Sequence, residues 1–275
     1  MTAKTDKKVA LITGGATGIG KETAFKLAAA GVHIVIAGRH QARGSAVAAE
    51  LMRTGARAIF VRADVAVETQ VKNLIAQTLS FFGRLDYLFN NAGTEGTLGS
   101  LENMTENMMD EVLGTNVKGV LLCTKYALPV MVKQGGGTII NTASFVGTTL
   151  PLPAAVLYGA SKAAVLSVTR AVAAACTGQH IDVFAVCPWV TDTPMADRLA
   201  GQNATAKARF GASFNPSGKI AAAGDIADVV FSLFTSRQLL RSGEAILVDH
   251  GGLIKKILPM SIEPHPFAPL HGSTS

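Results

Sequence analysis

The sequence places a phenol and an ammonium four residues apart, as Tyr158 and Lys162, in a segment of helical composition. Residues i and i+4 lie on the same face of a helix, so the two groups can come close together. A phenol with its usual pKa of about 10 transfers protons poorly at neutral pH, and a nearby positive charge favours the phenolate and lowers that pKa. The spacing is therefore compatible with a tyrosine that acts as a general acid or base, although such pairs also occur by chance on many helices.

A glycine-rich segment, GGATGIG at residues 14–20, lies between a strand-like run and a helix-like run. Glycines at such a junction let the backbone approach a pyrophosphate, and the N-terminus of the following helix offers unpaired N–H groups and a positive dipole end. A tight turn alone would also need glycine. The position after the first strand nevertheless predicts a dinucleotide site, with glycines spaced more widely than in G-x-G-x-x-G.

The end of the second strand-like run bears on the choice of dinucleotide. An acidic residue there would bind the adenosine ribose and repel a 2′-phosphate, but the chain has Gly38 followed by Arg39. A guanidinium at this place suits the phosphate, so the sequence favours NADP(H) and leaves NAD(H) open. Asp64 and Val65, after the third run, suit the adenine, and Asp64 could instead cap a helix.

Strand-like and helix-like patterns alternate along most of the chain, which is typical of a parallel sheet with helices on both faces. The predicted strands are 9–13, 33–38, 58–63, 85–90, 137–142, 182–186 and 245–248. The predicted helices include 18–30, 41–54, 69–82, 106–133, 157–177 and 225–234. We therefore expect Tyr158, Lys162 and the glycine turn to belong to one α/β fold.

The length of 275 residues suits one large domain, here predicted as residues 1–252. Residues 190–222 lack strand character and mix apolar with small and charged residues, so we expect a substrate lid or, more simply, a surface helix and loop. Residues 253–275 contain several prolines, which cannot continue a helix or a central strand. We expect this tail to run extended over a surface.

The net charge of +6 is concentrated at the start of the chain, where residues 1–62 hold ten Lys and Arg against three Asp and Glu. A local excess suits an anionic cofactor, and most of these charges could simply be solvated, so we expect no nucleic-acid partner. No apolar run reaches the length of a membrane span, which together with the N-terminus indicates a cytoplasmic protein. Three separated cysteines, Cys123, Cys176 and Cys187, lie in apolar patterns and are expected to be reduced core thiols, with no metal site.

With these motifs in order, residues 8–252 resemble the short-chain dehydrogenase/reductase family. The resemblance rests on Thr13-Gly14-x-x-x-Gly18-x-Gly20, Asp64, Asn90-Asn91-Ala92-Gly93, Asn116, Ser144, Tyr158-x-x-x-Lys162, and Pro188 leading to Thr193. It implies a Rossmann-type, doubly wound, seven-stranded parallel sheet in three α/β/α layers. The chain departs from the family pattern in having Trp189 after Pro188, where glycine is usual, and His250 within the usual Asp-Gly-Gly.

The resemblance also implies a division of roles. Tyr158 would protonate the carbonyl oxygen, Ser144 would hydrogen-bond it, Lys162 would bind the nicotinamide ribose and lower the pKa of Tyr158, and Asn116 would hold a relay water. The implied cofactor-binding residues are Gly14, Thr17, Gly18, Ile19, Gly20, Arg39, Asp64, Val65, Asn91, Ala92, Gly93, Tyr158, Lys162, Pro188, Val190 and Thr193. Singly, Ser144, Asn116 and Tyr158 could have ordinary structural roles; together they point to one ligand crevice.

The predicted substrate pocket is mainly apolar, and its one acidic member, Glu95, could simply face solvent. Its members are Thr94, Glu95, Phe145, Leu150, Leu152, Leu157, Trp189, Met195, Leu199, Phe210 and Phe214. Such walls favour NADP(H)-dependent interconversion of a hydrophobic ketone and a secondary alcohol. The alternatives are a 3-oxoacyl reductase and, without catalysis, an NADP-binding sensor. The apolar composition, with mean hydropathy +0.33, predicts a homotetramer or homodimer. The family resemblance implies that its subunits pair through helices 106–133 and 157–177.

Overall fold

The computed structural model describes residues 6–148, 152–200, 203–212, 220–236, 240–249 and 253–258. Its centre is a sheet in the order β10-β9-β6-β5-β4-β1-β2-β3. The strands are β1 (Val9–Thr13), β2 (His33–Gly38), β3 (Ala58–Arg62), β4 (Tyr87–Asn90), β5 (Gly137–Thr142), β6 (Ile181–Pro188), β9 (Ala245–Asp249) and β10 (Leu253–Leu258). The seven predicted strands are confirmed, and all seven run parallel.

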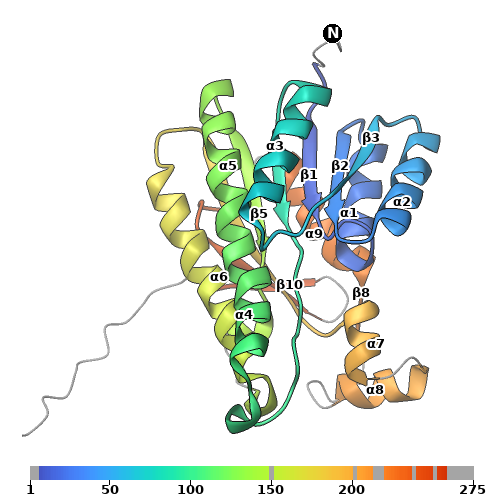
Figure 1. The fold of residues 1–275 in the computed structure, drawn as a ribbon, viewed down its shortest axis with the longest axis vertical. Coiled ribbons are helices and arrows are strands. Elements are labelled where there is room, and N and C mark those ends of the chain that lie inside the picture. The colour runs from blue at the N-terminus through green and yellow to red at the C-terminus, as the bar shows by residue number, and fades with distance from the viewer. Residues whose placement is uncertain are drawn as a thin grey trace, which may run out of the picture.

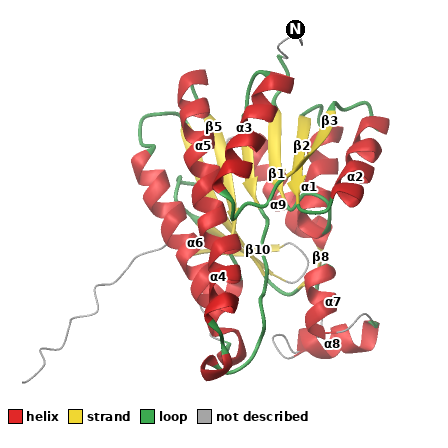
Figure 2. Ribbon diagram, in the orientation of Figure 1, coloured by secondary structure: helices red, strands yellow, loops and turns green. Residues whose placement is uncertain are grey.

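Helices cover both faces of this sheet (Figures 1 and 2). One face carries α1 (Gly18–Ala29), α2 (Gln41–Arg53) and α9 (Ala223–Thr235), and the other carries α3 (Glu68–Phe82), α5 (Gly119–Gln134) and α6 (Val156–Ala175). Neighbouring residues of β1 alternate between the two cores: Ile12 packs with the first set of helices and Leu11 with the second. The strands are therefore apolar on both faces, as a buried parallel sheet requires.

The edge of the sheet differs from the prediction for residues 253–258. These residues form β10, which pairs antiparallel with β9, instead of an extended tail over a surface. An edge position tolerates the change of direction because only one side of the strand needs a partner. The four tail prolines lie beyond residue 258, outside the described residues.

The segment 190–222 also contains regular structure that the sequence did not reveal. Two short strands, β7 (Thr191–Asp192) and β8 (Ala221–Ala222), pair in parallel at its two ends. Between them lie α7 (Pro194–Ala200) and α8 (Ala204–Ala212), which project from the carboxyl edge of the sheet (Figure 1). The prediction that this segment lacks strands is wrong, because two-residue strands leave no period in the sequence.

The predicted helix 106–133 is not one regular helix. It consists of α4 (Glu106–Leu113), a π-helical turn (Gly114–Lys118) and α5. A π turn inserts one extra residue into the helical path and is frequent at functional sites. Composition does not reveal it, since the surrounding residues all favour a helix.

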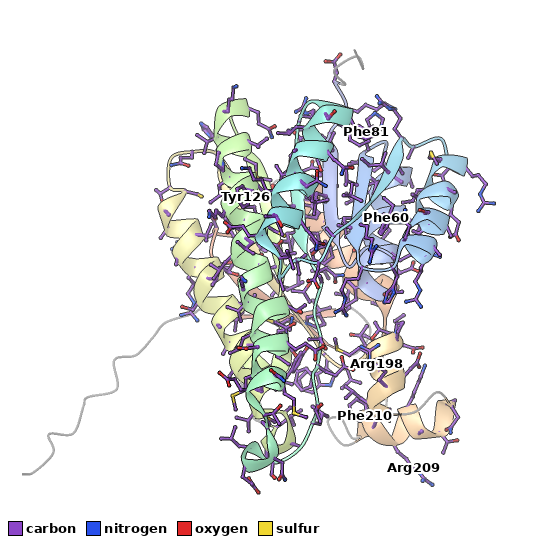
Figure 3. The ribbon with its side chains drawn as sticks, viewed as in Figure 1. Phe60, Phe81, Tyr126, Arg198, Arg209 and Phe210 are labelled. Carbon is purple, nitrogen blue, oxygen red and sulfur yellow. The ribbon has the colours of Figure 1, made fainter. Side chains whose placement is uncertain are left out.

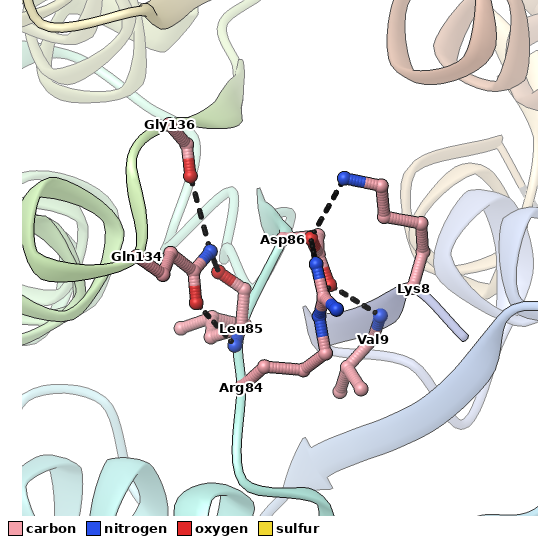
Figure 4. Close-up of polar contacts among 7 residues, drawn as sticks. All are labelled: Lys8, Val9, Arg84, Leu85, Asp86, Gln134 and Gly136. Carbon is pink, nitrogen blue, oxygen red and sulfur yellow. Dashed lines mark hydrogen bonds and ion pairs between the residues drawn. The ribbon is translucent and has the colours of Figure 1, made fainter. Parts of the chain in front are cut away.

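The opposite, amino-terminal edge of the sheet is fixed around the buried carboxylate of Asp86 (Figure 4). Asp86 accepts hydrogen bonds from Arg84 Nε at 2.8 Å, Lys8 Nζ at 2.9 Å and the backbone N–H of Val9 at 2.9 Å. Burial alone would raise the pKa of this carboxyl, but these donors hold it below its usual value. The network joins the beginnings of β1 and β4, the two strands on which the site is built.

Within the described ranges, no helix is both long and apolar enough to cross a membrane. The three cysteines are buried as separate thiols.

Candidate active site

The glycine turn after β1 has the backbone geometry that only glycine adopts readily. Gly14 has φ +65° and Gly18 has φ +50°, both in the left-handed region. A Cβ on Gly20 would lie 2.5 Å from the carbonyl oxygen of Gly14, so a side chain there would push helix and turn apart. Thr17 makes no side-chain cap at the start of α1, which leaves the first N–H groups of the helix for a ligand phosphate.

The segment after β4 is tied directly to this turn. The side-chain amide of Asn91 donates to the carbonyl oxygens of Thr13, at 3.1 Å, and Gly14, at 3.3 Å. The backbone N–H groups of Asn91 and Ala92 both donate to Thr13 Oγ1 at 3.0 Å. The turn and the Asn91–Gly93 segment thus form one rigid cradle at the point where the strand order reverses, where ligands bind in such sheets.

One cavity of about 450 Å³ runs along the carboxyl edge of the sheet from this cradle. Most of the predicted cofactor residues line it: Gly14, Thr17, Gly18, Ile19, Asn91, Ala92, Gly93, Tyr158, Lys162, Pro188, Val190 and Thr193. Thr193 also lies against the glycine turn. A Cβ added to Gly18 would be 3.1 Å from Thr193 Cγ2. The open turn, the unpaired helix N-terminus and the cavity beside them fit an elongated nucleotide with a pyrophosphate.

The remaining predicted cofactor residues do not line the cavity. Gly20 lies behind the turn, and Arg39 is exposed after β2 at the same edge of the sheet. Asp64 accepts from the N–H of Ala66 at 2.9 Å, so it closes a turn two residues long and does not cap α3, whose N-cap is Val67. Val65 is buried against the start of α5, close to Gly119.

Three of the four predicted catalytic residues meet in the cavity: Ser144, Tyr158 and Lys162. Ser144 follows β5 by two residues, and its hydroxyl is hydrogen-bonded to the phenol of Tyr158. Tyr158 and Lys162 share one face of α6, and Lys162 Nζ lies 5.6 Å from the centre of the Tyr158 ring. A carbonyl oxygen next to Tyr158 would therefore meet two hydroxyl donors.

The protonation of this group differs from the prediction that Lys162 lowers the pKa of Tyr158. Burial raises the pKa of Tyr158 to about 12, against the opposing hydrogen bond of Ser144, and the negative charge of Glu95 raises it further. Burial also lowers the pKa of Lys162 to about 8, and its Nζ donates to the carbonyl oxygen of Thr142 at 2.8 Å. Desolvation is the largest cause of both shifts, and Tyr158 is a protonated donor at neutral pH.

Asn116, the fourth predicted catalytic residue, is fully buried in the π turn behind the cavity. Its amide donates to the carbonyl oxygen of Thr94 at 2.8 Å and to Ser161 Oγ at 3.0 Å, while its Oδ1 accepts from the N–H of Thr94 at 2.8 Å. Asn116 Oδ1 and Lys162 Nζ would each lie 3.3 Å from a Cβ on Gly93. The π turn thus brings Asn116 next to Lys162 and fixes the segment after β4 to α6.

The far part of the cavity has an apolar wall made of two aromatic rings that pack against each other at a tilt. Phe145 and Trp189 have ring centroids 4.4 Å apart at an angle of 32°. Of the predicted pocket residues, Glu95, Phe145, Leu152, Trp189, Met195, Leu199 and Phe210 line the cavity. Thr94 and Leu157 are absent from its lining, and Leu150 and Phe214 lie outside the described residues.

Glu95 does not face solvent, contrary to the simpler prediction. It is only 7% exposed, and Arg198 of α7 binds it through two nitrogens, with Nε–Oε1 at 2.6 Å and Nη2–Oε2 at 2.9 Å. Arg198 and Phe210 reach the cavity from α7 and α8 (Figure 3). The sequence analysis missed Arg198, as well as Leu98, which also lines the cavity, because no local pattern links residues 103 positions apart.

Comparison with known proteins agrees with this geometry. Residues 8–204 match the family model for short chain dehydrogenase. A 3beta-hydroxysteroid dehydrogenase of Mediterraneibacter gnavus is 34% identical over 75% of the chain and 74% of its own length. A 3-oxoacyl-[acyl-carrier-protein] reductase of Synechocystis is 41% identical over 72% of the chain and 80% of its own length.

Solved structures of the same fold are similar over nearly the whole chain. Levodione reductase has a TM-score of 0.83 at 33% identity, covering 90% of this chain and 98% of its own. Other neighbours include an actinorhodin polyketide ketoreductase variant with NADPH, at 29% identity, and a Brucella melitensis 3-ketoacyl reductase with NADH, at 31%. The chain belongs to the short-chain dehydrogenase/reductase family, whose members are nicotinamide-dependent oxidoreductases of hydroxyl and keto groups.

Proposed function

We propose that this protein is an NADP(H)-dependent oxidoreductase that interconverts a hydrophobic ketone and a secondary alcohol. The observation that carries the proposal is the single cavity that joins the glycine cradle, the Ser144–Tyr158–Lys162 group and the Phe145–Trp189 wall. The cradle suits a dinucleotide, the hydroxyl pair suits a carbonyl oxygen, and the aromatic wall suits an apolar substituent.

A nicotinamide bound in this cavity would supply the hydride for reduction and accept it for oxidation. Tyr158 gives its proton to the substrate oxygen as the carbonyl carbon is reduced, and takes it back in the reverse direction. Ser144 donates a hydrogen bond to the same oxygen and stabilises the negative charge that develops there. Lys162 holds the ribose hydroxyls, and Asn116 holds a water that returns a proton to the group.

The preference for NADP(H) rests on the adenosine end of the site. Arg39 is exposed directly after β2, and no carboxylate occupies the preceding position, Gly38. Arg62 lies beside Gly38 in the strand register, so a second guanidinium-bearing residue is close by. A 2′-phosphate would be attracted here, where a carboxylate would repel it. NAD(H) remains the second candidate cofactor, as one structural relative was solved with NADH.

A 3-oxoacyl thioester is the second candidate substrate, and the similarity to 3-oxoacyl-[acyl-carrier-protein] reductases favours it. An acidic carrier protein would need a basic surface beside the cavity. Of the described residues that line the cavity, only Lys162 and Arg198 are basic; the first is buried and the second is paired with Glu95. The small apolar ketone is therefore the first choice.

The proposal is tested by NADPH oxidation with a panel of cyclohexanones, acetophenones and straight-chain ketones, with acetoacetyl-CoA as the rival substrate. We expect turnover of at least one apolar ketone with kcat/KM above that for acetoacetyl-CoA. The reverse order would favour the 3-oxoacyl reductase. Cofactor binding without turnover of any ketone, alcohol or thioester would support the sensor and overturn the enzyme assignment.

We also propose that the protein is a cytoplasmic homo-oligomer that associates through α4, α5 and α6. Leu113, Leu121, Val132 and Val156 are each at least 40% exposed on these helices. Leu121 and Val132 are eleven residues apart on α5, which places them on one stripe of the helix. Exposed apolar side chains gathered in this way are typical of surfaces that other subunits cover.

A further inference from the structure

The ion pair between Glu95 and Arg198 is an unusual feature of a cavity with mainly apolar walls. Both residues line the cavity, one from the segment after β4 and the other from α7. The Glu95 side chain is 8% exposed, whereas that of Arg198 is 57% exposed. The carboxylate therefore lies inside, and the guanidinium covers it from the solvent side of the mouth.

The pair joins two parts of the site that are far apart in the sequence, the segment after β4 and α7. The segment that carries Glu95 is fixed to the protein body, because Asn116 holds the adjacent Thr94 through two hydrogen bonds. Arg198 belongs to α7, which also turns Met195 and Leu199 into the cavity. A bidentate arginine–carboxylate contact restricts both distance and orientation, so it fixes how α7 lies over the substrate.

The pair is also balanced in charge. Arg198 donates from Nε and Nη2, and the two carboxylate oxygens of Glu95 accept these hydrogen bonds. Two further carboxylates among the described residues of the lid, Asp192 and Asp197, are also paired, because Lys207 of α8 binds each of them at 2.6 Å. A substrate therefore meets a neutral pair, and a charged substituent there would have to compete with an existing ion pair.

We propose that Glu95 and Arg198 are positioning and specificity-determining residues that fix α7 over the cavity and restrict the site to uncharged substrates. This inference rests on the proposed function for the identity of the site. Removal of one partner should convert the neutral wall into a charged one. The change of charge preference should then have opposite signs for the two single variants.

A matched series of cyclic ketones tests this, because the three probes differ mainly in charge: 4-methylcyclohexanone, 4-oxocyclohexanecarboxylate and 4-aminocyclohexanone. Trp189 is the only tryptophan of the chain and lines the cavity, so its fluorescence can report binding in the presence of NADP⁺ without any turnover. For the wild type we expect the neutral ketone to bind most tightly.

The two single variants should diverge. In Glu95→Gln the uncovered guanidinium should raise the affinity for the carboxylate probe, relative to the neutral one, by at least about fivefold. In Arg198→Met the uncovered carboxylate should raise the relative affinity for the ammonium probe by a similar factor. The double variant Glu95→Gln/Arg198→Met should again prefer the neutral ketone, which separates a charge effect from a general loss of packing.

A second readout comes from the pH dependence of alcohol oxidation. The groups that face Tyr158 are Ser144, Cys187 of β6, Glu95, and Lys162 on its own helix. The charge of Glu95 raises the pKa of Tyr158, so Glu95→Gln should move the rising limb of kcat/KM to lower pH, and Arg198→Met should move it to higher pH. A purely structural contact would slow both variants without moving the limb in opposite directions.

Unchanged charge preference in both folded single variants, or the same shift in both, would overturn the inference. Circular dichroism and thermal unfolding establish that the variants are folded, and where one single variant is unstable the charge preference of the other is compared with that of the double variant. Charge-dependent binding in a protein that turns over no ketone would uphold the inference and contradict the proposed function. The two hypotheses can therefore fail separately.

Discussion

Lys162 Nζ donates to the carbonyl oxygen of Thr142 at 2.8 Å, so a fully buried ammonium is attached to the last residue of β5. Burial lowers its pKa to about 8, which means that the charged form is kept at a cost in stability. A lysine retained under such conditions indicates that the charge serves the chemistry of the site.

Lys162→Met should therefore stabilise the protein while it abolishes activity. The pKa of Lys162 is lower in the folded state than in the unfolded chain, so the wild type gains stability as pH rises from about 8 to about 10.5. We expect the variant to exceed the wild type in free energy of unfolding at pH 7, and the difference to shrink across that range. Urea unfolding at several pH values measures this, and a destabilised variant at pH 7 would contradict it.

Tyr158→Phe should lower turnover by at least about 10²-fold, because it removes the proton donor and leaves the ring in place. NADPH affinity should change little. Tyr126→Phe is the matched control, since the Tyr126 hydroxyl binds Glu68 on the surface, at 2.8 Å. A Tyr158→Phe rate near that of the wild type would remove Tyr158 from the mechanism.

Arg39→Ala should weaken the binding of NADPH more than the binding of NADH, because only NADPH carries the 2′-phosphate that the guanidinium would bind. We expect at least about a fivefold change in the ratio of the two Kd values, which is about 1 kcal/mol. Arg53→Ala, at the far end of α2, controls for a general change of charge. Equal losses for the two cofactors would exclude a phosphate contact.

Asp86→Asn should destabilise the fold by roughly 1.5–3 kcal/mol at pH 7, because it removes a buried charge that three side-chain and backbone groups contact. The pKa of Asp86 is lower in the folded protein, so its contribution is present above the unfolded pKa of about 4 and is lost as pH falls through the folded pKa. The stability difference between variant and wild type should therefore narrow in acid. A difference that is independent of pH down to acid unfolding would contradict the assignment.

The exposed apolar stripe of α5, formed by Leu121 and Val132, predicts that the protein is an oligomer. The wild type should sediment as a dimer or tetramer at micromolar concentration, and Leu121→Glu/Val132→Glu should dissociate it, since a subunit interface would bury both charges. Met52→Glu is the control, because Met52 is an exposed apolar residue on α2, away from this surface. A monomeric wild type would refute the interface outright.

The parts of the fold that the sequence predicted are those with a local period. β1, β2 and β5 begin and end where the apolar runs do, and the first glycine turn lies where strand and helix patterns meet. The parts of the structure that the sequence did not predict depend on contacts between residues far apart in the chain. In the π turn, Asn116 contacts Thr94 and Ser161, which are distant in the sequence. Arg198 of α7 likewise binds Glu95, which is 103 residues away.

The same distinction explains the error in the proton chemistry. The spacing of Tyr158 and Lys162 predicted their common face correctly, but spacing does not report burial. Desolvation acts on both groups and raises one pKa while it lowers the other. The balance between a neighbouring charge and the loss of water can be read only from the packed structure.

The π turn at 114–118 has a consequence for how the chain tolerates length changes. One residue turns an α-helix by about 100°, so the additional residue in this turn offsets the faces of α4 and α5 relative to each other. Deletion of a single residue here could restore an unbroken α-helix and would rotate either Asn116 or the exposed apolar stripe of α5 out of place. Composition alone would predict that this helix tolerates insertions and deletions. The π turn instead fixes the length of the segment, because that length sets the position of Asn116 in the interior of the site and of the apolar stripe on the outer surface of the subunit.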